Sequence, residues 1–343
     1  MKIAVDAMGG DFAPGEIVKG ALLAAKEYNQ PLILVGDEVK IRAEMGLNSL
    51  DNLISIVHAP EVIQMNEQPA VSVRRKKNSS IVMATRLVKE GEASALVSAG
   101  STGAAMAAAL LGLGRIKGID RPAIAGVLPN VKGFTVLLDI GANTDCKPHN
   151  LLQFGIMGYL YAKNILGVEE PRVGLLSNGE EKTKGNETTL SAFPLLTDAD
   201  INFIGNVEGR DIFCGGVDVV VCDGFVGNIV LKAGEGLAMA LYKMMREEIT
   251  KSWLAKIGTL MAEPALRMFK SRVDYAEYGG APLLGVDGIS IICHGSSTSR
   301  ALKNGIGVAR QSVEKGLVKS IRESIAGSVQ RKGAGVNLAR RID

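Results

Sequence analysis

The sequence predicts an α/β protein built as a doubly wound, three-layer α/β/α sheet. Short β-branched runs alternate with longer segments of helical periodicity, a pattern typical of mostly parallel strands covered by helices on both faces. The chain has 343 residues, of which 47% are hydrophobic and 22% charged, so it is long enough to bury a large core. We therefore expect residues 1–325 to form one large domain, and residues 326–343 to form a flexible tail.

The predicted strands are Ile3–Val5, Leu32–Val35, Leu53–Val57, Ala95–Ser98, Ala123–Val127, Thr135–Leu138, Val173–Leu176, Phe203–Ile204, Val217–Cys222 and Ile289–Cys293. The longest predicted helices between them are Gly15–Tyr28, Ser79–Glu90, Gly103–Leu113, Pro148–Ile165 and Gly227–Glu248.

Gly-rich loops follow most of the predicted strands. They read DAMGGD (6–11), SAGSTGA (98–104), DIGANTD (139–145), SNGEEKTKGNE (177–187), DGFVGN (223–228) and HGSS (294–297). Ligands of open α/β sheets bind beyond the carboxyl ends of the strands, and a helix N-terminus favours phosphate or carboxylate. We therefore expect these loops to meet at one rim that binds an anion.

Several familiar sites are absent from the sequence. GLGRIKG (112–118) follows a helix and has the wrong spacing for a dinucleotide fingerprint, and no G-x-x-x-x-G-K-[ST] motif is present. The histidines are scattered, and Asp6, Asp139 and Asp223 come singly, which argues against a metal site and leaves loop bracing as their simpler role. His294 in CHGSS is either a structural residue or the base of a catalytic triad.

Composition restricts the location and the partners. A net charge of +3 argues against a nucleic-acid partner, and four cysteines without a C-x-x-C motif are typical of a reduced, cytoplasmic protein. No apolar run approaches the roughly 20 residues that span a bilayer. The sequence thus predicts a cytoplasmic protein that has no metal and no cofactor.

Two segments suggest surface interactions. RRKKNSS (74–80) is either a solvated face or a docking patch for an acidic partner. In residues 251–272, Trp253, Ile257, Leu260 and Met261 share one helical face, cations dominate the remainder, and Pro264 breaks the helix. This amphipathic insertion either lies on an anionic membrane surface or packs in a dimer.

Taken in order, the motifs resemble the phosphate acyltransferase family of bacterial phospholipid synthesis. They are VDAMGGDFAPGEIVKGA, RRKKNSS, SAGSTGA, GRIKGIDRPA, LDIGANTDCKPHNLLQFGIMG, GEEKTKGNE, VVVCDGFVGNIVLKAGEG, YGGAPLLG and HGSS, and they extend from residue 1 to about residue 325. The resemblance implies a fold similar to isocitrate and isopropylmalate dehydrogenases and to phosphotransacetylases, and it implies a homodimer. It also implies transfer of a long-chain fatty acyl group from acyl carrier protein to inorganic phosphate.

Such a reaction needs no nucleophile from the enzyme, because phosphate is partly a dianion at neutral pH and attacks the thioester itself. We assign the catalytic roles to Lys184, which neutralises phosphate or the oxyanion, and to Asn228, a carboxamide donor. The remaining phosphate- and substrate-binding positions are Asp6, Gly9, Gly10, Ser98, Ser101, Thr102, Gly103, Asn143, Gly224 and His294.

The resemblance also names partners for the two surface segments. Acyl carrier protein is acidic, so Arg74, Arg75, Lys76, Arg115 and Lys117, with Arg121, are candidates for its docking patch. The acyl-phosphate product is used by a membrane acyltransferase, so Trp253, Ile257, Leu260 and Met261 are candidates for contact with the inner face of the membrane. The rival functions are a phosphotransacetylase-like enzyme of short acyl-CoA, a metal- and NAD-dependent decarboxylating dehydrogenase, and a membrane scaffold without activity.

Overall fold

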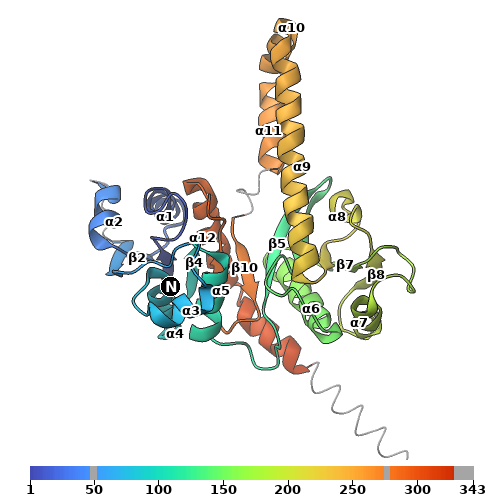
Figure 1. Ribbon diagram of the computed structural model, residues 1–343, viewed down its shortest axis with the longest axis horizontal. Helices are drawn as coiled ribbons and strands as arrows, with labels where there is room; N and C mark the ends of the chain where they lie inside the picture. Colours follow the sequence, from blue (N-terminus) through green and yellow to red (C-terminus); the bar gives the residue numbers. More distant parts are fainter. Residues whose placement is uncertain (47–51, 274–278, 328–343) are drawn as a thin grey trace, which may run out of the picture.

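A computed structural model describes residues 1–46, 52–273 and 279–327 of the chain. The predicted tail therefore falls almost entirely outside the described residues, apart from residues 326 and 327, which end a helix over 317–327. The body is a large twisted sheet with helices on both faces, and a helical arm projects from it (Figure 1).

Eleven strands of the described chain form one sheet in the order β3-β2-β1-β4-β11-β10-β5-β6-β9-β7-β8. Their bounds are β1 Ile3–Asp6, β2 Leu32–Gly36, β3 Ile54–His58, β4 Ala95–Ser98, β5 Ala123–Asn130, β6 Gly133–Leu138, β7 Val173–Leu176, β8 Phe203–Val207, β9 Val219–Val221, β10 Ala281–Leu284 and β11 Ile289–Ile292. Every predicted strand is confirmed within a few residues. β10 was missed.

The missed strand changes the direction of half the sheet. β10 pairs antiparallel with β11 and with β5, and β5 pairs antiparallel with β6, whereas all other pairings are parallel. After these three reversals, β6, β9, β7 and β8 run opposite to β3, β2, β1, β4 and β11. The expectation of one continuous rim of strand ends is therefore wrong, because the carboxyl ends of the two parallel groups point in opposite directions along the sheet.

The helices are α1 Gly15–Tyr28, α2 Glu38–Met45, α3 Pro69–Arg75, α4 Ser80–Lys89, α5 Thr102–Gly112, α6 Pro148–Asn164, α7 Glu187–Thr197, α8 Asp211–Cys214, α9 Gly224–Lys251, α10 Trp253–Met261, α11 Glu263–Val273 and α12 Ser299–Glu314. They divide between the two faces of the sheet, because strand side chains alternate in direction. Ile3 and Val5 of β1 share one core with α1, α6 and α12, whereas Ala4 lies in a second core with α4 and α5. Leu137 of β6 belongs to a third core with α8 and the base of α9. The three-layer α/β/α prediction is confirmed.

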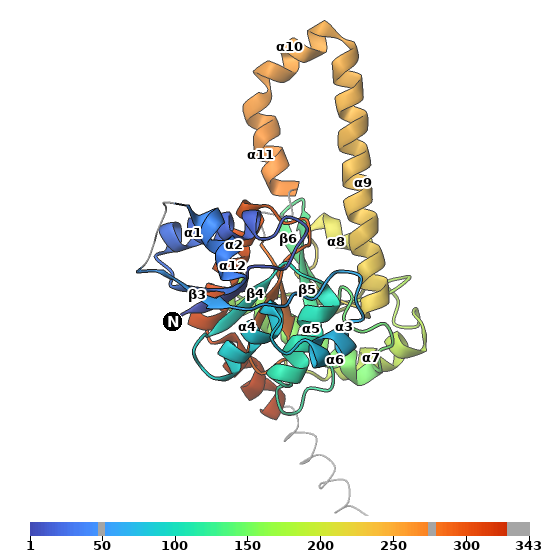
Figure 2. The same cartoon turned by 60° about the vertical axis from the view of Figure 1, so that its left-hand side comes forward.

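Helices α9, α10 and α11 form the arm. α9 rises from the body, α10 turns at the far end and α11 returns toward the body (Figures 1 and 2). Within the described chain, α9 meets the length and composition expected of a membrane-crossing helix, and only 11% of its apolar window is buried. α10 has no buried residue. The predicted break falls at Ala262, between α10 and α11, which places Pro264 in the first turn of α11, where its missing N–H is tolerated.

Candidate functional site

The loops at the strand ends form two clusters. The Asp6 cluster contains the loops after β1, β4 and β11, and the Asp139 cluster contains the loops after β6, β7 and β9. The first lies in the half of the sheet that holds the amino terminus, and the second lies at the foot of α9 (Figure 1). Both are rich in the residues that the sequence singled out.

Asp6 is an internal brace of the first cluster. Ser98 Oγ donates to Asp6 Oδ2 at 2.7 Å, and the Met8 N–H donates to Asp6 Oδ1 at 3.3 Å. Asp6 is 2% exposed and Ser98 is 1% exposed. Burial raises the pKa of Asp6, although hydrogen bonds from Ser80, Ser98 and two backbone N–H groups oppose the rise. Asp6 and Ser98 therefore hold the loops together from below.

The Gly9-Gly10 pair allows three loops to approach closely. A Cβ at Gly9 would lie 2.5 Å from Asp6 Oδ2 and 2.8 Å from the backbone nitrogen of Gly100. Gly10 has a φ of 119°, in the region that favours glycine, and a Cβ there would lie 3.2 Å from the carbonyl oxygen of Gly295. Larger side chains at either position would separate the loops.

The other predicted residues of this cluster lie at helix ends or at the surface. Ser101 caps α5, because its Oγ accepts the Ala104 N–H at 3.4 Å, and Thr102 and Gly103 are the first residues of that helix. His294 is exposed, and its Nδ1 lies 2.8 Å from Ser296 Oγ.

The Asp6 cluster encloses a small hollow with room for about one water molecule. Its lining residues come from strand ends, from the N-termini of α4 and α5, and from the segment before α3. They are Asp6, Gly9, Val62, Ile63, Ser80, Ile81, Ser98, Gly100, Ser101 and Ala104.

Asp139 shapes the second cluster. It is completely buried and accepts the backbone N–H groups of Ile124, Gly141, Ala142 and Asn143 at 3.1, 3.2, 3.0 and 2.7 Å. Asn143 Nδ2 adds a fifth donor at 2.9 Å. Burial raises the pKa of Asp139, and these donors oppose that rise. So many N–H groups on one carboxyl fold the loop after β6 into a fixed shape.

Asn143 links this loop to a neighbouring one. Its Nδ2 also donates to the carbonyl oxygen of Pro122 at 2.7 Å, so the carboxamide nitrogen faces inward. The residue before Pro122 is Arg121, which is exposed, and its positive charge weakly opposes the rise in pKa that burial causes at Cys146 in the same cluster. The chain segment 114–121 thus brings an arginine to the edge of the Asp139 cluster.

The N-terminus of α9 rests directly on the Asp139 loop. The Gly224 N–H donates to the carbonyl oxygen of Asn143 at 2.7 Å, and Asp223 caps the helix by accepting the Val226 N–H at 2.8 Å. A Cβ at Gly227 would lie 1.8 Å from the carbonyl oxygen of Asp139, so only glycine allows this contact.

Asn228 is exposed and lies over Gly141. A Cβ built at Gly141 would be 3.9 Å from Asn228 Oδ1. Lys184 is also exposed, in a loop held by the Lys184 N–H bond to the Glu181 carbonyl oxygen at 3.0 Å. Because β7 pairs parallel with β9, Lys184 and Asn228 follow adjacent strands at the same edge of the sheet.

Two cysteine thiols lie near the Asp139 loop at this edge of the sheet. Cys146 Sγ lies 3.6 Å from the Asn143 carbonyl oxygen, and Cys222 Sγ lies 3.5 Å from that of Asp139. Burial, together with the charges of Asp139 and Asp223, raises the pKa of Cys146 to about 12, and burial also raises the pKa of Cys222. Both therefore remain thiols at neutral pH, which makes them poor nucleophiles.

The predicted basic patch is divided between the clusters. Arg74 and Arg75 are exposed at the end of α3, but Lys76 Nζ is engaged by Glu67 Oε1 at 2.6 Å and by the Val62 carbonyl oxygen at 2.8 Å. Arg115 and Lys117 lie instead in segment 114–121, where the Arg115 guanidinium contacts the Asp120 carbonyl oxygen. Lys76 is thus already paired with Glu67, and the docking role of the five residues stays a prediction.

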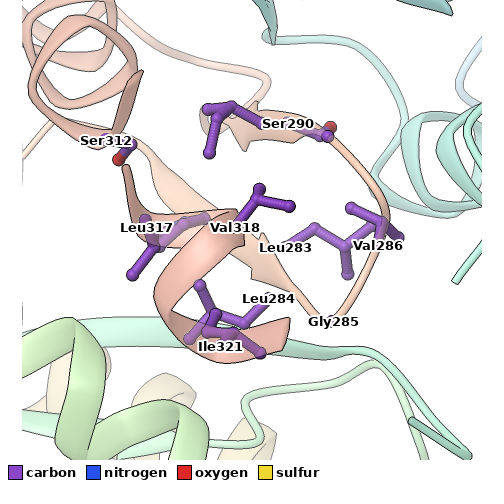
Figure 3. A pocket seen from close by; sticks show the side chains of 12 residues that line it. Leu283, Leu284, Gly285, Val286, Ser290, Ser312, Leu317, Val318 and Ile321 are labelled. Atoms are coloured by element: carbon purple, nitrogen blue, oxygen red, sulfur yellow. The ribbon is translucent and has the colours of Figure 1, made fainter. Parts of the chain in front are cut away.

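Other candidate sites are less suitable. Among the described residues, no three His, Cys, Asp or Glu side chains gather as metal ligands would. A second hollow lies between the β10–β11 hairpin and the helix over 317–327 (Figure 3). Its lining is aliphatic apart from Ser290 and Ser312, and it has no titratable side chain, so it offers no group for catalysis.

Comparison with known proteins identifies the family. A model of the family described as fatty acid synthesis protein matches residues 1–320. The chain belongs to this family. A relative from Pelotomaculum thermopropionicum named phosphate acyltransferase is 74% identical over 343 residues, with 100% of both chains covered. Another of that name, from Heliobacterium modesticaldum, is 58% identical over 332 residues, with 96% of this chain and 99% of the relative covered. The resemblance predicted from the motifs is confirmed, and the chain is an acyltransferase.

Solved structures support the fold. A phosphotransacetylase from Streptococcus pyogenes superposes with a TM-score of 0.65 at 17% identity, covering 92% of this chain and 94% of that one. A 4-hydroxythreonine-4-phosphate dehydrogenase from Klebsiella pneumoniae superposes with a TM-score of 0.52 at 15% identity, covering 91% and 99% of the two chains. At these identities the likeness establishes the architecture alone, and it confirms the predicted phosphotransacetylase-like fold.

Proposed function

We propose that this enzyme transfers a long-chain fatty acyl group from acyl carrier protein to inorganic phosphate, and that phosphate attacks the thioester directly. The acyl-phosphate that results would serve phospholipid synthesis. The proposal agrees with the family and with the names of its relatives. The observation that carries the mechanism is the chemistry of the Asp139 cluster, where exposed cationic and amide groups accompany thiols that stay protonated.

Each step has a residue suited to it. Lys184 supplies a positive charge at the end of β7, and Arg121 supplies a second one beside the Asp139 loop. Either cation stabilises a phosphate dianion or the oxyanion that forms as the thioester carbon is attacked. The Asn228 carboxamide is a neutral donor on the adjacent loop. When the intermediate collapses, the carbon–sulfur bond breaks and the thiolate of the carrier leaves.

Asp6, Gly9, Gly10, Ser98, Asn143 and Gly224 have a supporting role in this proposal, because they fix the shapes of the two clusters. The exposed residues His294 and Thr102, and the half-buried helix-start residues Ser101 and Gly103, stay predictions as substrate contacts. Asp6 already accepts hydrogen bonds from Ser98 Oγ and the Met8 N–H, and its contact with substrate stays a prediction.

The test is turnover with defined substrates. Purified enzyme, palmitoyl-acyl carrier protein and phosphate should yield acyl-phosphate, which hydroxylamine traps as a hydroxamate. Lys184→Ala combined with Asn228→Ala should lower kcat/KM by roughly 100-fold or more, because two groups that stabilise charge are lost. Lys182→Ala is the matched control, since Lys182 lies in the same loop but its Nζ packs over the Phe193 ring. Undiminished turnover in the double variant would rule out the assigned roles.

The second candidate is a phosphotransacetylase-like enzyme that uses acyl-CoA. The fold of the solved phosphotransacetylases favours it as an alternative. Rates with palmitoyl-acyl carrier protein, palmitoyl-CoA and acetyl-CoA at equal concentration distinguish the two. A kcat/KM for acetyl-CoA above that for the carrier-protein thioester would favour the alternative.

We also propose a homodimer that rests on the inner face of the membrane, with the arm as the contact. The apolar side chains of the arm support this, since Trp253, Leu260 and Met261 are 70, 73 and 80% exposed. Exposed apolar patches of this kind mark partner or membrane surfaces. The cytoplasmic location and the delivery of product to a membrane acyltransferase belong to the same proposal.

A further inference from the structure

The segment 114–121 has an apolar side and a cationic side. Ile116 and Ile119 are buried, and the Ile116 N–H donates to the carbonyl oxygen of Gly285 at 3.0 Å. Arg121 ends the segment, two residues before β5 begins, and is exposed. The segment is thus attached to the body by its apolar side and presents its last cation beside the Asp139 cluster.

Gln153 of α6 holds the backbone of this segment at two points. Its Nε2 donates to the carbonyl oxygen of Gly118 at 2.7 Å, and its Oε1 accepts the Asp120 N–H at 2.9 Å. Nε2 also lies 3.3 Å from Nε2 of His149, one turn earlier in the helix. Gln153 is 2% exposed, so its carboxamide depends on these protein partners rather than on solvent.

A second buried carboxamide holds the residue that follows Arg121. Asn143 Nδ2 donates to the Pro122 carbonyl oxygen at 2.7 Å and to Asp139 Oδ2 at 2.9 Å. Backbone groups on both sides of Arg121 are therefore fixed, by one side chain from the Asp139 loop and one from the helix that follows it. The backbone of Arg121 cannot shift without breaking these bonds, whereas its side chain is exposed.

The fixed backbone suits Arg121 to an anionic substrate. A guanidinium binds phosphate through directional, charge-assisted hydrogen bonds, so the position from which the side chain extends matters. An arginine on an unsupported loop would have to be ordered when the anion binds, and that ordering opposes binding. Around Arg121 the two carboxamides have already ordered the backbone, so more of the interaction energy remains for holding phosphate.

We infer that Gln153 is a positioning residue for phosphate, which acts through Arg121 by holding the segment 114–121 against α6. Gln153 is buried and its carboxamide is bonded to the segment, so it affects phosphate only through the residues that the segment carries. The inference rests on the proposed transfer to phosphate, and it adds a residue that serves one of the two substrates.

Kinetics of Gln153→Met test the inference. Methionine has a similar size but cannot form the bonds to Gly118 and Asp120, so the segment loosens. The KM for phosphate should rise about tenfold, with the KM for an acyl-pantetheine thioester unchanged within about twofold. Acyl-pantetheine replaces the carrier protein here, because Arg115 and Lys117 of the same segment are candidates for carrier docking. An equal rise in both KM values, or no rise in either, contradicts the inference.

Gln30→Met is the matched control. Gln30 is also a buried glutamine that holds backbone, since its Nε2 donates to the carbonyl oxygens of Met1 and Pro31 at 2.9 Å each, but it precedes β2 in the half of the sheet that holds the Asp6 cluster. The substitution removes bonds of the same kind, so a general loss of packing would affect both variants alike. Gln30→Met should leave both KM values unchanged, and a rise in the KM for phosphate equal to that of Gln153→Met contradicts the inference.

The Arg121→Ala background distinguishes positioning from an independent contribution of Gln153. Without the guanidinium, adding Gln153→Met should change the KM for phosphate by less than about twofold, because the glutamine acts through Arg121. Additive effects of the two substitutions would mean that Gln153 acts by another route.

Phosphate binding without turnover separates the inference from the proposed function. In the wild-type enzyme without acyl substrate, inorganic phosphate should protect Arg121 from phenylglyoxal, which modifies guanidinium groups, as located by mass spectrometry. In Gln153→Asn, whose shorter carboxamide cannot reach Gly118 and Asp120 together, half-protection should need about threefold more phosphate or higher. Protection of this kind in an enzyme that forms no acyl-phosphate would retain the inference and overturn the proposed reaction. An unprotected Arg121 in the wild type, or equal protection in the variant, overturns the inference.

Discussion

Gly227 shows how much of the site depends on single residues. Alanine normally stabilises a helix relative to glycine by about 1 kcal/mol, but a Cβ here meets the Asp139 carbonyl oxygen at 1.8 Å. Overpacking costs about 1–3 kcal/mol, so the steric term exceeds the propensity gain and Gly227→Ala should lower the free energy of unfolding. Urea denaturation measures this change. Gly236→Ala, in the same helix with open space around it, should stabilise the protein slightly; a stabilised Gly227→Ala variant would mean that α9 does not rest on the Asp139 loop.

At the residue scale, the sequence indicated which loops matter but not which atoms face a ligand. Asp6 and Gly9-Gly10 were recognised because a carboxylate and two glycines follow a strand. The burial of Ser98 and Asn143 could not be predicted, because it depends on hydrogen bonds to residues distant in the chain. Ser98 bonds to Asp6, 92 residues away, and Asn143 bonds to Pro122, 21 residues away. Gln153 was not singled out within its motif. Its role arises only when the segment 114–121 folds against α6.

At the scale of elements, the arm is the clearest target. In α10, Trp253 and Leu260 lie on the exposed apolar side, so Trp253→Glu with Leu260→Glu should abolish sedimentation with anionic liposomes while leaving the oligomeric state unchanged. Sedimentation assays and light scattering measure the two effects. Thr250→Ala, an uncharged change at the end of α9, is the control and should change neither. If the glutamate variant became monomeric yet still bound liposomes, the apolar side would be a dimer contact instead.

Long elements with a clear hydrophobic periodicity were predicted better than short ones. α1 and α6 match their predicted starts because an apolar stripe and Pro148 define them. β10 was missed because it has only four residues and contains Pro282, and a proline argues against an interior strand. Missing β10 led to the wrong expectation of a single rim, because the reversals of strand direction that begin at β10 divide the strand ends into two clusters.

At the scale of the whole molecule, the position of the basic residues predicts how the carrier protein docks. Arg74→Glu with Arg75→Glu should raise the KM for acyl carrier protein about tenfold and leave the rate with acyl-pantetheine unchanged. Lys76 is left intact because its reversal would break the contact with Glu67. Arg86→Glu on α4 is a control for a general change in charge. Equal effects on both substrates would place the damage in the active site rather than in docking.

The long helix of the arm has one more consequence. α9 has 28 residues, a rod of about 42 Å, and its first turn is wedged against the Asp139 loop by Gly224 and Gly227. A tilt of ~5° about that foot displaces the far end by ~4 Å but moves Asn228, about 6 Å from the pivot, by only ~0.5 Å. The outer end can thus follow an uneven, fluctuating surface while the carboxamide at the foot scarcely shifts against its neighbours.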